Sequence, residues 1–185
     1  MKKLLSSEQV SDALDGLYQA IFSHWPDLQH NPPAIIGIRT RGEIIAQRFV
    51  ERLSREQGLA VQQGVLDVTF YRDDLSQRKG APLVRATEID FDLEDRTLVL
   101  IDDVLHTGRS VRAALDALMD FGRPKAIRLA VLVDRGGREL PIAADYVGTR
   151  LDVPDDLRVQ VNLSEQDGQD AVYLIQSKPK SREAQ

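Results

Sequence analysis

Three short, largely apolar runs recur along the chain, and each ends in a polar turn. They span residues 34–38, 98–101 and 126–133. Apolar runs of this length, bounded by turns, are typical of strands buried on both faces of a parallel sheet. The carboxyl ends of parallel strands meet at one edge of the sheet, where open α/β proteins bind their ligands. The three polar turns are therefore expected to lie together.

Apolar positions between these runs recur at helical intervals and predict three helices. The first begins at Ser6, which has the spacing of a capping box with Gln9, and ends before Pro26. The second follows Gly42 and the third follows Ser110. Further strands are expected at residues 61–69, 158–163 and 172–175. The predicted apolar faces of the three helices are Val10, Leu14, Leu17, Tyr18 and Ile21; Ile45, Ala46, Phe49, Val50 and Leu53; and Val111, Ala114, Leu115, Leu118 and Met119.

Composition limits the number of domains and the classes of function that fit this α/β pattern. With 185 residues, 42% of them hydrophobic, the chain can bury one sizeable core. We expect a single domain over residues 1–177 and a disordered tail, 178–185. A net charge of −5 argues against nucleic-acid binding through overall charge, and we expect no DNA partner. The chain has no cysteine, which excludes thiolate chemistry, and no apolar run of membrane-spanning length. We expect a soluble, cytoplasmic protein.

The turn after the second apolar run has the strongest functional pattern. Asp102 and Asp103 follow the strand directly, and the sequence Thr-Gly-Arg-Ser at 107–110 leads into the third helix. The N–H groups and the positive dipole end of a helix N-terminus bind anions, and the hydroxyls of Thr107 and Ser110 can add donors. Two carboxylates that can hold a diol, beside a phosphate cradle, predict a site for a sugar phosphate.

Two other interpretations fit parts of this turn. An apolar strand that ends in Asp-Asp also occurs in nucleotide triphosphatases, but these need Gly-x-x-x-x-Gly-Lys-Ser/Thr, which is absent. Asp or Thr before a helix can also serve for capping alone, without a ligand. The whole string 102–110 is more specific than either pattern.

The turn after the first run, Arg39-Thr40-Arg41-Gly42, is basic and opens the second helix. Gly42 permits close backbone approach, and the two arginines could hold a diphosphate through charge-assisted hydrogen bonds. The alternative is a solvated basic turn in which the glycine eases the bend. Beside the sugar-phosphate site, we favour the diphosphate interpretation.

The polar stretch 75–82 has no apolar period, and residues 72–88 around it contain both basic and acidic side chains. The stretch is either the tip of a β-hairpin or a lid. A lid would exclude water from a reaction at the sugar-phosphate site. We therefore predict a lid whose basic residues are Arg72, Arg78, Lys79 and Arg85, with Arg85 placed to approach a diphosphate.

Longer stretches around these turns resemble one family. The string at 102–110 is similar to the PRPP-binding motif of type I phosphoribosyltransferases. The wider match comprises LDVTFYRDDL at 66–75, DVLxTGR at 103–109, AALDALMDxGRP at 113–124, LVDRGxRELP at 132–141 and ADYVG at 144–148. Together these resemble the PyrR family, which are attenuators of the pyrimidine operon and also uracil phosphoribosyltransferases.

The resemblance implies a type I phosphoribosyltransferase fold, with a small hood over the base site. It also implies a homodimer or tetramer and transfer of ribosyl 5-phosphate from PRPP to uracil, with Mg2+, to give UMP and diphosphate. The implied PRPP contacts are Asp102, Asp103, Val104, Leu105, His106, Thr107, Gly108, Arg109 and Ser110. Asp102 and Asp103 are also the implied catalytic pair and, through ribose or water, the metal site. The implied base pocket is Val133, Asp134, Arg135 and Arg138.

Four positions depart from the family pattern. His106 stands where tyrosine is usual; a titratable ring could act in catalysis, but uracil N1 is acidic enough that we interpret His106 as a loop substituent. Gly137, Ala143 and Thr149 replace residues that are commonly His, Arg and Lys in members that bind RNA.

Two function classes therefore stay open. One is an enzyme that also binds the leader mRNA of the pyrimidine operon in response to UMP. The other is a phosphoribosyltransferase for another base without an RNA role. The candidate RNA contacts are Arg138 and Arg150, on a face with Arg158 that is interrupted by Asp145, Asp152, Asp155 and Asp156.

Overall fold

The structure is a computed structural model that describes residues 1–23, 25–68, 87–154 and 156–176. The predicted lid residues Arg72, Arg78, Lys79 and Arg85, and the tail 178–185, lie outside the described residues. Among the helices that are described, none is long and apolar enough to cross a membrane.

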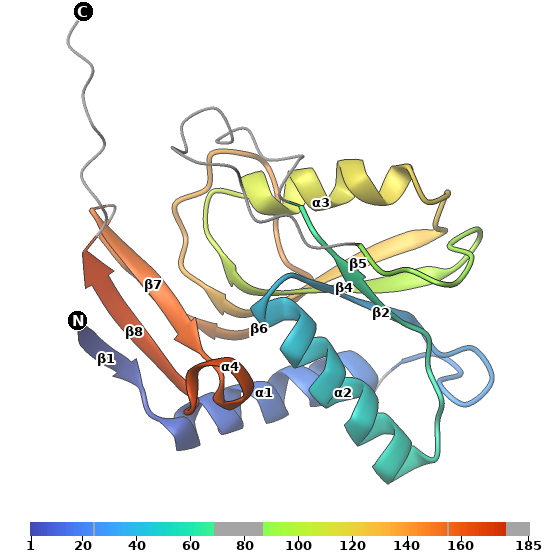
Figure 1. The fold of residues 1–185 in the computed structure, drawn as a ribbon, viewed down its shortest axis with the longest axis horizontal. Helices are drawn as coiled ribbons and strands as arrows, with labels where there is room; N and C mark the ends of the chain where they lie inside the picture. The colour runs from blue at the N-terminus through green and yellow to red at the C-terminus, as the bar shows by residue number, and fades with distance from the viewer. Residues whose placement is uncertain (24, 69–86, 155, 177–185) are drawn as a thin grey trace, which may run out of the picture.

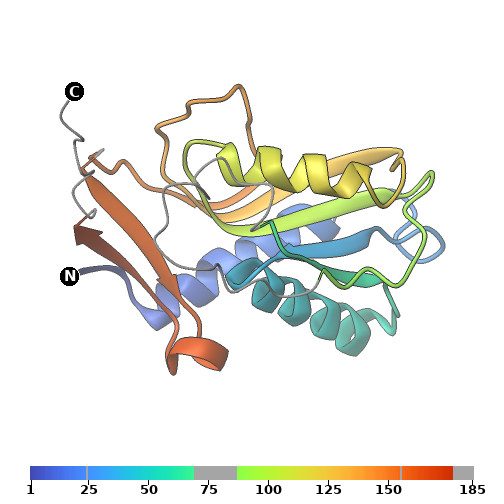
Figure 2. The ribbon, with the colours of Figure 1, turned by 45° about the horizontal axis from the view of Figure 1, so that its top comes forward.

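A five-stranded parallel sheet forms the centre of the fold, with the strand order β3-β2-β4-β5-β6. The strands are β2 (Ala34–Ile38), β3 (Gln63–Leu66), β4 (Thr97–Leu105), β5 (Ala126–Asp134) and β6 (Tyr146–Arg150). The three apolar runs form β2, β4 and β5, which lie side by side as predicted. Every residue of β2 is buried, because helices cover both faces of the sheet. Figures 1 and 2 show this layered arrangement.

Two strand boundaries differ from the prediction. The second strand was expected to end with its apolar run at Ile101, and this boundary is wrong. Strand β4 stays paired with β5 through Leu105, which lies opposite Asp134. The two acids therefore lie among the last residues of β4, and pairing with β5 fixes their backbone. The strand expected at 61–69 is shorter and runs only from Gln63 to Leu66.

The helices α1 (Ser7–Phe22) and α2 (Arg41–Gln57) cover one face of the sheet, and α3 (Arg109–Met119) covers the other (Figure 2). The predicted capping box at Ser6 and Gln9 is present, with both reciprocal hydrogen bonds. The predicted apolar faces pack into two clusters, one on each side of the sheet. Met119 is an exception, since it is 52% exposed at the end of α3 and not part of the core.

A second, antiparallel sheet with the order β1-β8-β7 forms the hood. Its strands are β1 (Lys2–Leu5), β7 (Leu157–Asn162) and β8 (Ala171–Gln176), and the short helix α4 (Ser164–Asp167) connects β7 to β8. The two ends of the described chain thus meet in one sheet (Figure 1). Strands β7 and β8 confirm the predicted strands near the C-terminus. Strands β1 and β6 were absent from the sequence prediction, because neither has a continuous apolar run.

Candidate functional site

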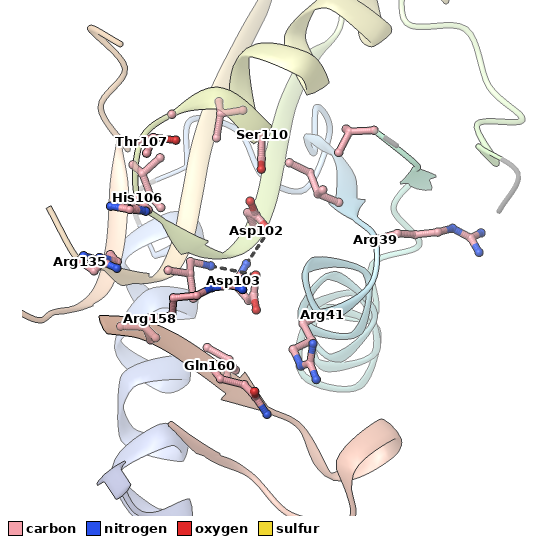
Figure 3. Close-up of a pocket in the computed structure, with 18 of the residues that line it drawn as sticks. Arg39, Arg41, Asp102, Asp103, His106, Thr107, Ser110, Arg135, Arg158 and Gln160 are labelled. Carbon is pink, nitrogen blue, oxygen red and sulfur yellow. Dashed lines mark hydrogen bonds between the residues drawn. The ribbon is translucent and has the colours of Figure 1, made fainter. Parts of the chain in front are cut away.

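A cavity of about 490 Å³ lies between the carboxyl end of β4 and the hood. It is the place where the two acids, the turn before α3 and the turn before α2 meet. Figure 3 shows the residues that line it. From the sheet side they include Arg39, Arg41, Asp102, Asp103, Val104, Leu105, His106, Thr107, Gly108, Ser110 and Arg135, and from the hood Arg158, Val159, Gln160, Val161 and Ile175.

Asp102 and Asp103 are held by successive backbone N–H groups. The N–H of Asp103 donates to Asp102 Oδ1 at 2.9 Å, and that of Val104 donates to Asp103 Oδ1 at 3.0 Å (Figure 3). Asp102 is 7% exposed. Burial raises the pKa of the Asp103 carboxyl above its usual range, against the lowering effects of the Asp102 hydrogen bond and of the Arg41 charge. Burial therefore disfavours the charged form of the Asp103 carboxyl, and a nearby positive charge favours it.

The turn before α3 presents a helix N-terminus to the cavity. Gly108 is the N-cap, with φ of 90°, a conformation that favours glycine. The N–H of Arg109 donates to Thr107 Oγ1 at 3.3 Å, while Ser110 points toward Asp102 (Figure 3). The N-cap residue Gly108 itself makes no side-chain capping hydrogen bond. Its first N–H groups and the two hydroxyls can hold a phosphate.

The turn before α2 packs tightly against the sheet through two glycines. A Cβ atom on Gly42 would overlap the Ile101 carbonyl oxygen, and one on Gly37 would overlap the backbone of Glu43. This close approach places the start of α2 beside the end of β4. The glycine at 42, predicted to permit such an approach, is thus required by the packing.

The two arginines of this turn point in different directions. Arg39 Nη2 pairs with Glu88 Oε1 at 2.7 Å, and Figure 3 shows its side chain extending away from Asp103. Arg41 instead pairs with Asp167 of the hood at 2.9 Å. Both residues line the cavity, but Arg41 lies near enough to affect the Asp103 carboxyl. Of the two arginines in this turn, Arg41 is thus the one whose positive charge acts on the Asp103 carboxyl.

The third turn, after β5, is built on two arginines that face inward. Arg135 is 4% exposed, and its guanidinium donates to the carbonyl oxygens of Leu157 at 2.8 Å and Val153 at 3.3 Å. Arg135 lines the cavity, and its hydrogen bonds fix the start of the hood. Val133 is fully buried, and Val133, Asp134 and Arg138, which were also expected in the base pocket, are not among the residues that line the cavity.

Arg138 pairs with Asp134 at 2.7 Å, and its Nε donates to the Ile142 carbonyl oxygen at 2.9 Å. Burial would raise the pKa of Asp134, but the hydrogen bonds from Arg138 and from the Gly136 N–H outweigh it and lower the pKa below its usual range. Arg138 is therefore largely engaged within the protein. Arg150, the other candidate RNA contact, is exposed at the end of β6.

The hood contributes cavity residues that the sequence analysis missed. Val159, Gln160 and Val161 line the cavity from β7, and Ile175 lines it from β8. Arg158 was grouped with the candidate RNA face; it is exposed and also lines the cavity. The residues of β7 alternate in type as a strand should, yet nothing local to them indicates which distant strand they will oppose.

This cavity, with two acids on a central strand and a helix N-terminus able to hold a phosphate under a hood, has the features of a phosphoribosyltransferase site. The family model for the phosphoribosyl transferase domain matches residues 1–163. A Bifunctional protein PyrR from Deinococcus radiodurans is 50% identical over 172 residues, covering 93% of each chain. Another from Elusimicrobium minutum is 48% identical and covers 95% of this chain and 97% of its own. The chain therefore belongs to the PyrR family.

Solved structures support the fold. The hypoxanthine phosphoribosyltransferase of Trypanosoma cruzi superposes with a TM-score of 0.65 at 16% identity, covering 96% of this chain and 98% of its own. A hypoxanthine-guanine phosphoribosyltransferase from Bacillus anthracis gives a TM-score of 0.63 at 18% identity, covering 84% and 85%. At such low identity the likeness shows the type I phosphoribosyltransferase fold and not the base that is used.

Proposed function

We propose that this protein is a uracil phosphoribosyltransferase, which transfers ribosyl 5-phosphate from PRPP to uracil and releases diphosphate. The observation that supports this most directly is the meeting of the acid pair, the helix N-terminus and the basic turn on one cavity. Relatives of about 50% identity named Bifunctional protein PyrR support uracil as the base.

In this proposal each part of the cavity holds one part of PRPP. Asp102 and Asp103 accept hydrogen bonds from the ribose hydroxyls, and residues 107–110 bind the 5′-phosphate. The turn 39–42 binds the diphosphate. The bond from the anomeric carbon to diphosphate breaks, uracil N1 bonds to that carbon, and the N1 proton passes to solvent. Catalysis then rests on positioning and on fixed charges around the developing oxocarbenium ion.

The donor set fits Mg2+ brought in with PRPP. Magnesium prefers carboxylate and phosphate oxygens and usually binds through one or two carboxylates and substrate phosphates. Within the described residues, no group of three or more His, Cys, Asp or Glu side chains could form a metal site of its own. Asp102 and Asp103 would hold the ion together with the substrate, where it would neutralise diphosphate charge.

Base recognition in this proposal falls to the backbone of residues 133–138 and to the facing hood strand. The test is formation of UMP from labelled PRPP and uracil with Mg2+, in competition with orotate, hypoxanthine and guanine. We expect uracil to be preferred. A preference for a purine base would overturn the assignment of the base, and no nucleotide product with any base would overturn the enzyme assignment.

A second role, supported by the word bifunctional in the relatives' name, is UMP-responsive binding of the leader mRNA of the pyrimidine operon. In this role the protein would act in the cytoplasm. A dimer or tetramer would present the small basic face of each subunit to the same RNA. Arg150 is the exposed cation best placed for RNA, because Arg138 faces inward. Filter binding with and without UMP, over a salt series, tests it. We expect Arg150→Ala to weaken binding and flatten the salt slope; an unchanged slope would argue against this face.

A further inference from the structure

One ion pair joins the diphosphate turn directly to the hood. Arg41 is the first residue of α2, and its Nη2 and Nε groups donate to the two carboxylate oxygens of Asp167 at 2.9 and 3.3 Å. Asp167 is the last residue of α4, between hood strands β7 and β8. The Arg41 side chain is 22% exposed and that of Asp167 is 16% exposed. Figure 3 shows Arg41 extending from the start of α2 toward the hood.

The Asp167 carboxylate is itself fixed by the hood backbone. Its Oδ2 atom accepts a hydrogen bond from the Leu163 N–H at 2.9 Å. The Asp167 carboxylate accepts hydrogen bonds from one edge of the Arg41 guanidinium, formed by Nε and Nη2. The other edge, at Nη1, makes no hydrogen bond within the part of the chain that the structure describes. Because a guanidinium is a planar fork, fixing one edge also fixes the direction of the other.

Arg41 is held by Asp167 at a position where it can contact a ligand in the cavity. Arg41 lines the cavity, and its charge acts on Asp103. A free arginine side chain loses rotamer entropy when a ligand orders it. An arginine that is ordered beforehand by a carboxylate avoids much of that loss.

We propose that Asp167 is a positioning residue that acts through Arg41, holding its guanidinium ready for the diphosphate of PRPP and so coupling the hood to the diphosphate turn. This inference rests on the proposed function. It assigns a role to a hood residue that does not itself line the cavity.

A neighbouring pair provides a matched control. Arg48, about two turns further along α2, pairs with Glu165 at 2.6 Å and with Asp170 at 2.7 Å, so it also ties α2 to the connection between β7 and β8. Arg48 and Glu165 do not line the cavity. Glu165→Gln therefore weakens a tie between α2 and the hood without touching the site.

The experiment measures initial rates against PRPP at saturating uracil and Mg2+. We expect Asp167→Asn to raise the KM for PRPP about tenfold, with kcat and the KM for uracil changed by less than about twofold. Glu165→Gln should leave the KM for PRPP unchanged. In an Arg41→Gln background, Asp167→Asn should have no further effect, because the residue that it positions is gone.

Three results would overturn the inference. An equal rise in KM with Glu165→Gln would mean that the pair only docks the hood. A lower KM with Asp167→Asn would mean that Asp167 competes with diphosphate for Arg41. An undiminished effect in the Arg41→Gln background would mean that Asp167 acts by another route.

A binding measurement separates this inference from the proposed function. If the wild-type protein forms no UMP, the proposed function fails, but calorimetric titration with magnesium diphosphate still tests the role of Asp167. We expect Asp167→Asn to bind about tenfold more weakly than wild type. Equal affinity, or no binding by either protein, would overturn the inference.

Discussion

Arg138 Nη1 lies 2.8 Å from the carbonyl oxygen of His106, and this bond joins the turn after β5 to the loop that precedes α3. The two turns belong to neighbouring strands of the sheet and approach the same cavity. The guanidinium also donates to the Ile142 carbonyl oxygen and pairs with Asp134. Arg138, which the sequence analysis predicted to be an RNA contact, thus supports the backbone of the loop that precedes α3.

We predict that Arg138→Ala raises the KM for PRPP about tenfold, because the loop backbone at His106 loses its donor. Arg138→Lys should recover part of this loss, since it keeps the ion pair with Asp134 but not the fork. Steady-state kinetics measure the effect, and Arg150→Ala is the control with an exposed arginine. A KM unchanged by Arg138→Ala would show that the loop holds its shape without this bond.

Asp103→Asn should separate activity from stability. We expect kcat/KM to fall by roughly 10²–10³, because in the proposed function this carboxylate orients the ribose and helps to hold magnesium. The free energy of unfolding should stay equal or rise by up to about 1 kcal/mol, since burial already disfavours the charged form of Asp103. Rate assays and urea denaturation measure the two effects. Parallel losses of activity and stability would instead indicate a structural role for the carboxylate.

Asp134→Asn should show a pH-dependent loss of stability. The folded protein lowers the pKa of Asp134, so its ion pair stabilises the fold above the unfolded-state value of about 4. That contribution is lost as the pH falls through the lowered folded-state pKa. We expect Asp134→Asn to cost about 1–2 kcal/mol at pH 7 and progressively less below about pH 4. Urea denaturation of the wild type and the variant across this pH range measures the difference in their free energies of unfolding. A difference that does not shrink at low pH would contradict the prediction.

Gly42→Ala should damage both the fold and the site. The new Cβ would overlap the Ile101 carbonyl oxygen, and backbone atoms cannot rotate away as a side chain can. We expect a loss of about 1–3 kcal/mol in the free energy of unfolding, with α2 displaced from Asp103 and little remaining activity. Gly16→Ala is the matched control, since nothing lies within 4 Å of its Cβ position in α1. It should be stabilising by about 0.5–1 kcal/mol, and equal behaviour of the two variants would contradict the packing argument.

The local patterns of the sequence determined most of the central sheet. Residues 34–38 form β2, the run at 98–101 lies within β4, and the capping box at Ser6 begins α1. Hydrophobic runs, helical spacing and caps act between residues close in the chain, so they can be recognised without knowing the fold. The acids at 102 and 103 and the Thr-Gly turn were located for the same reason. Their meeting with Arg41 follows from the shared edge of a parallel sheet.

Only the tertiary structure decided how the hood is made and where the arginines point. Strand β1 pairs with β8 from the far end of the chain, and β6 completes the sheet as an edge strand without a strong apolar signal. Arg158 lines the cavity, Arg138 turns inward and Arg41 reaches Asp167, and none of these directions can be read from the residues beside them in the sequence. A long charged side chain takes its direction from whichever distant carboxylate or carbonyl oxygen the fold brings within reach. That partner is set by chain topology and not by neighbouring residues.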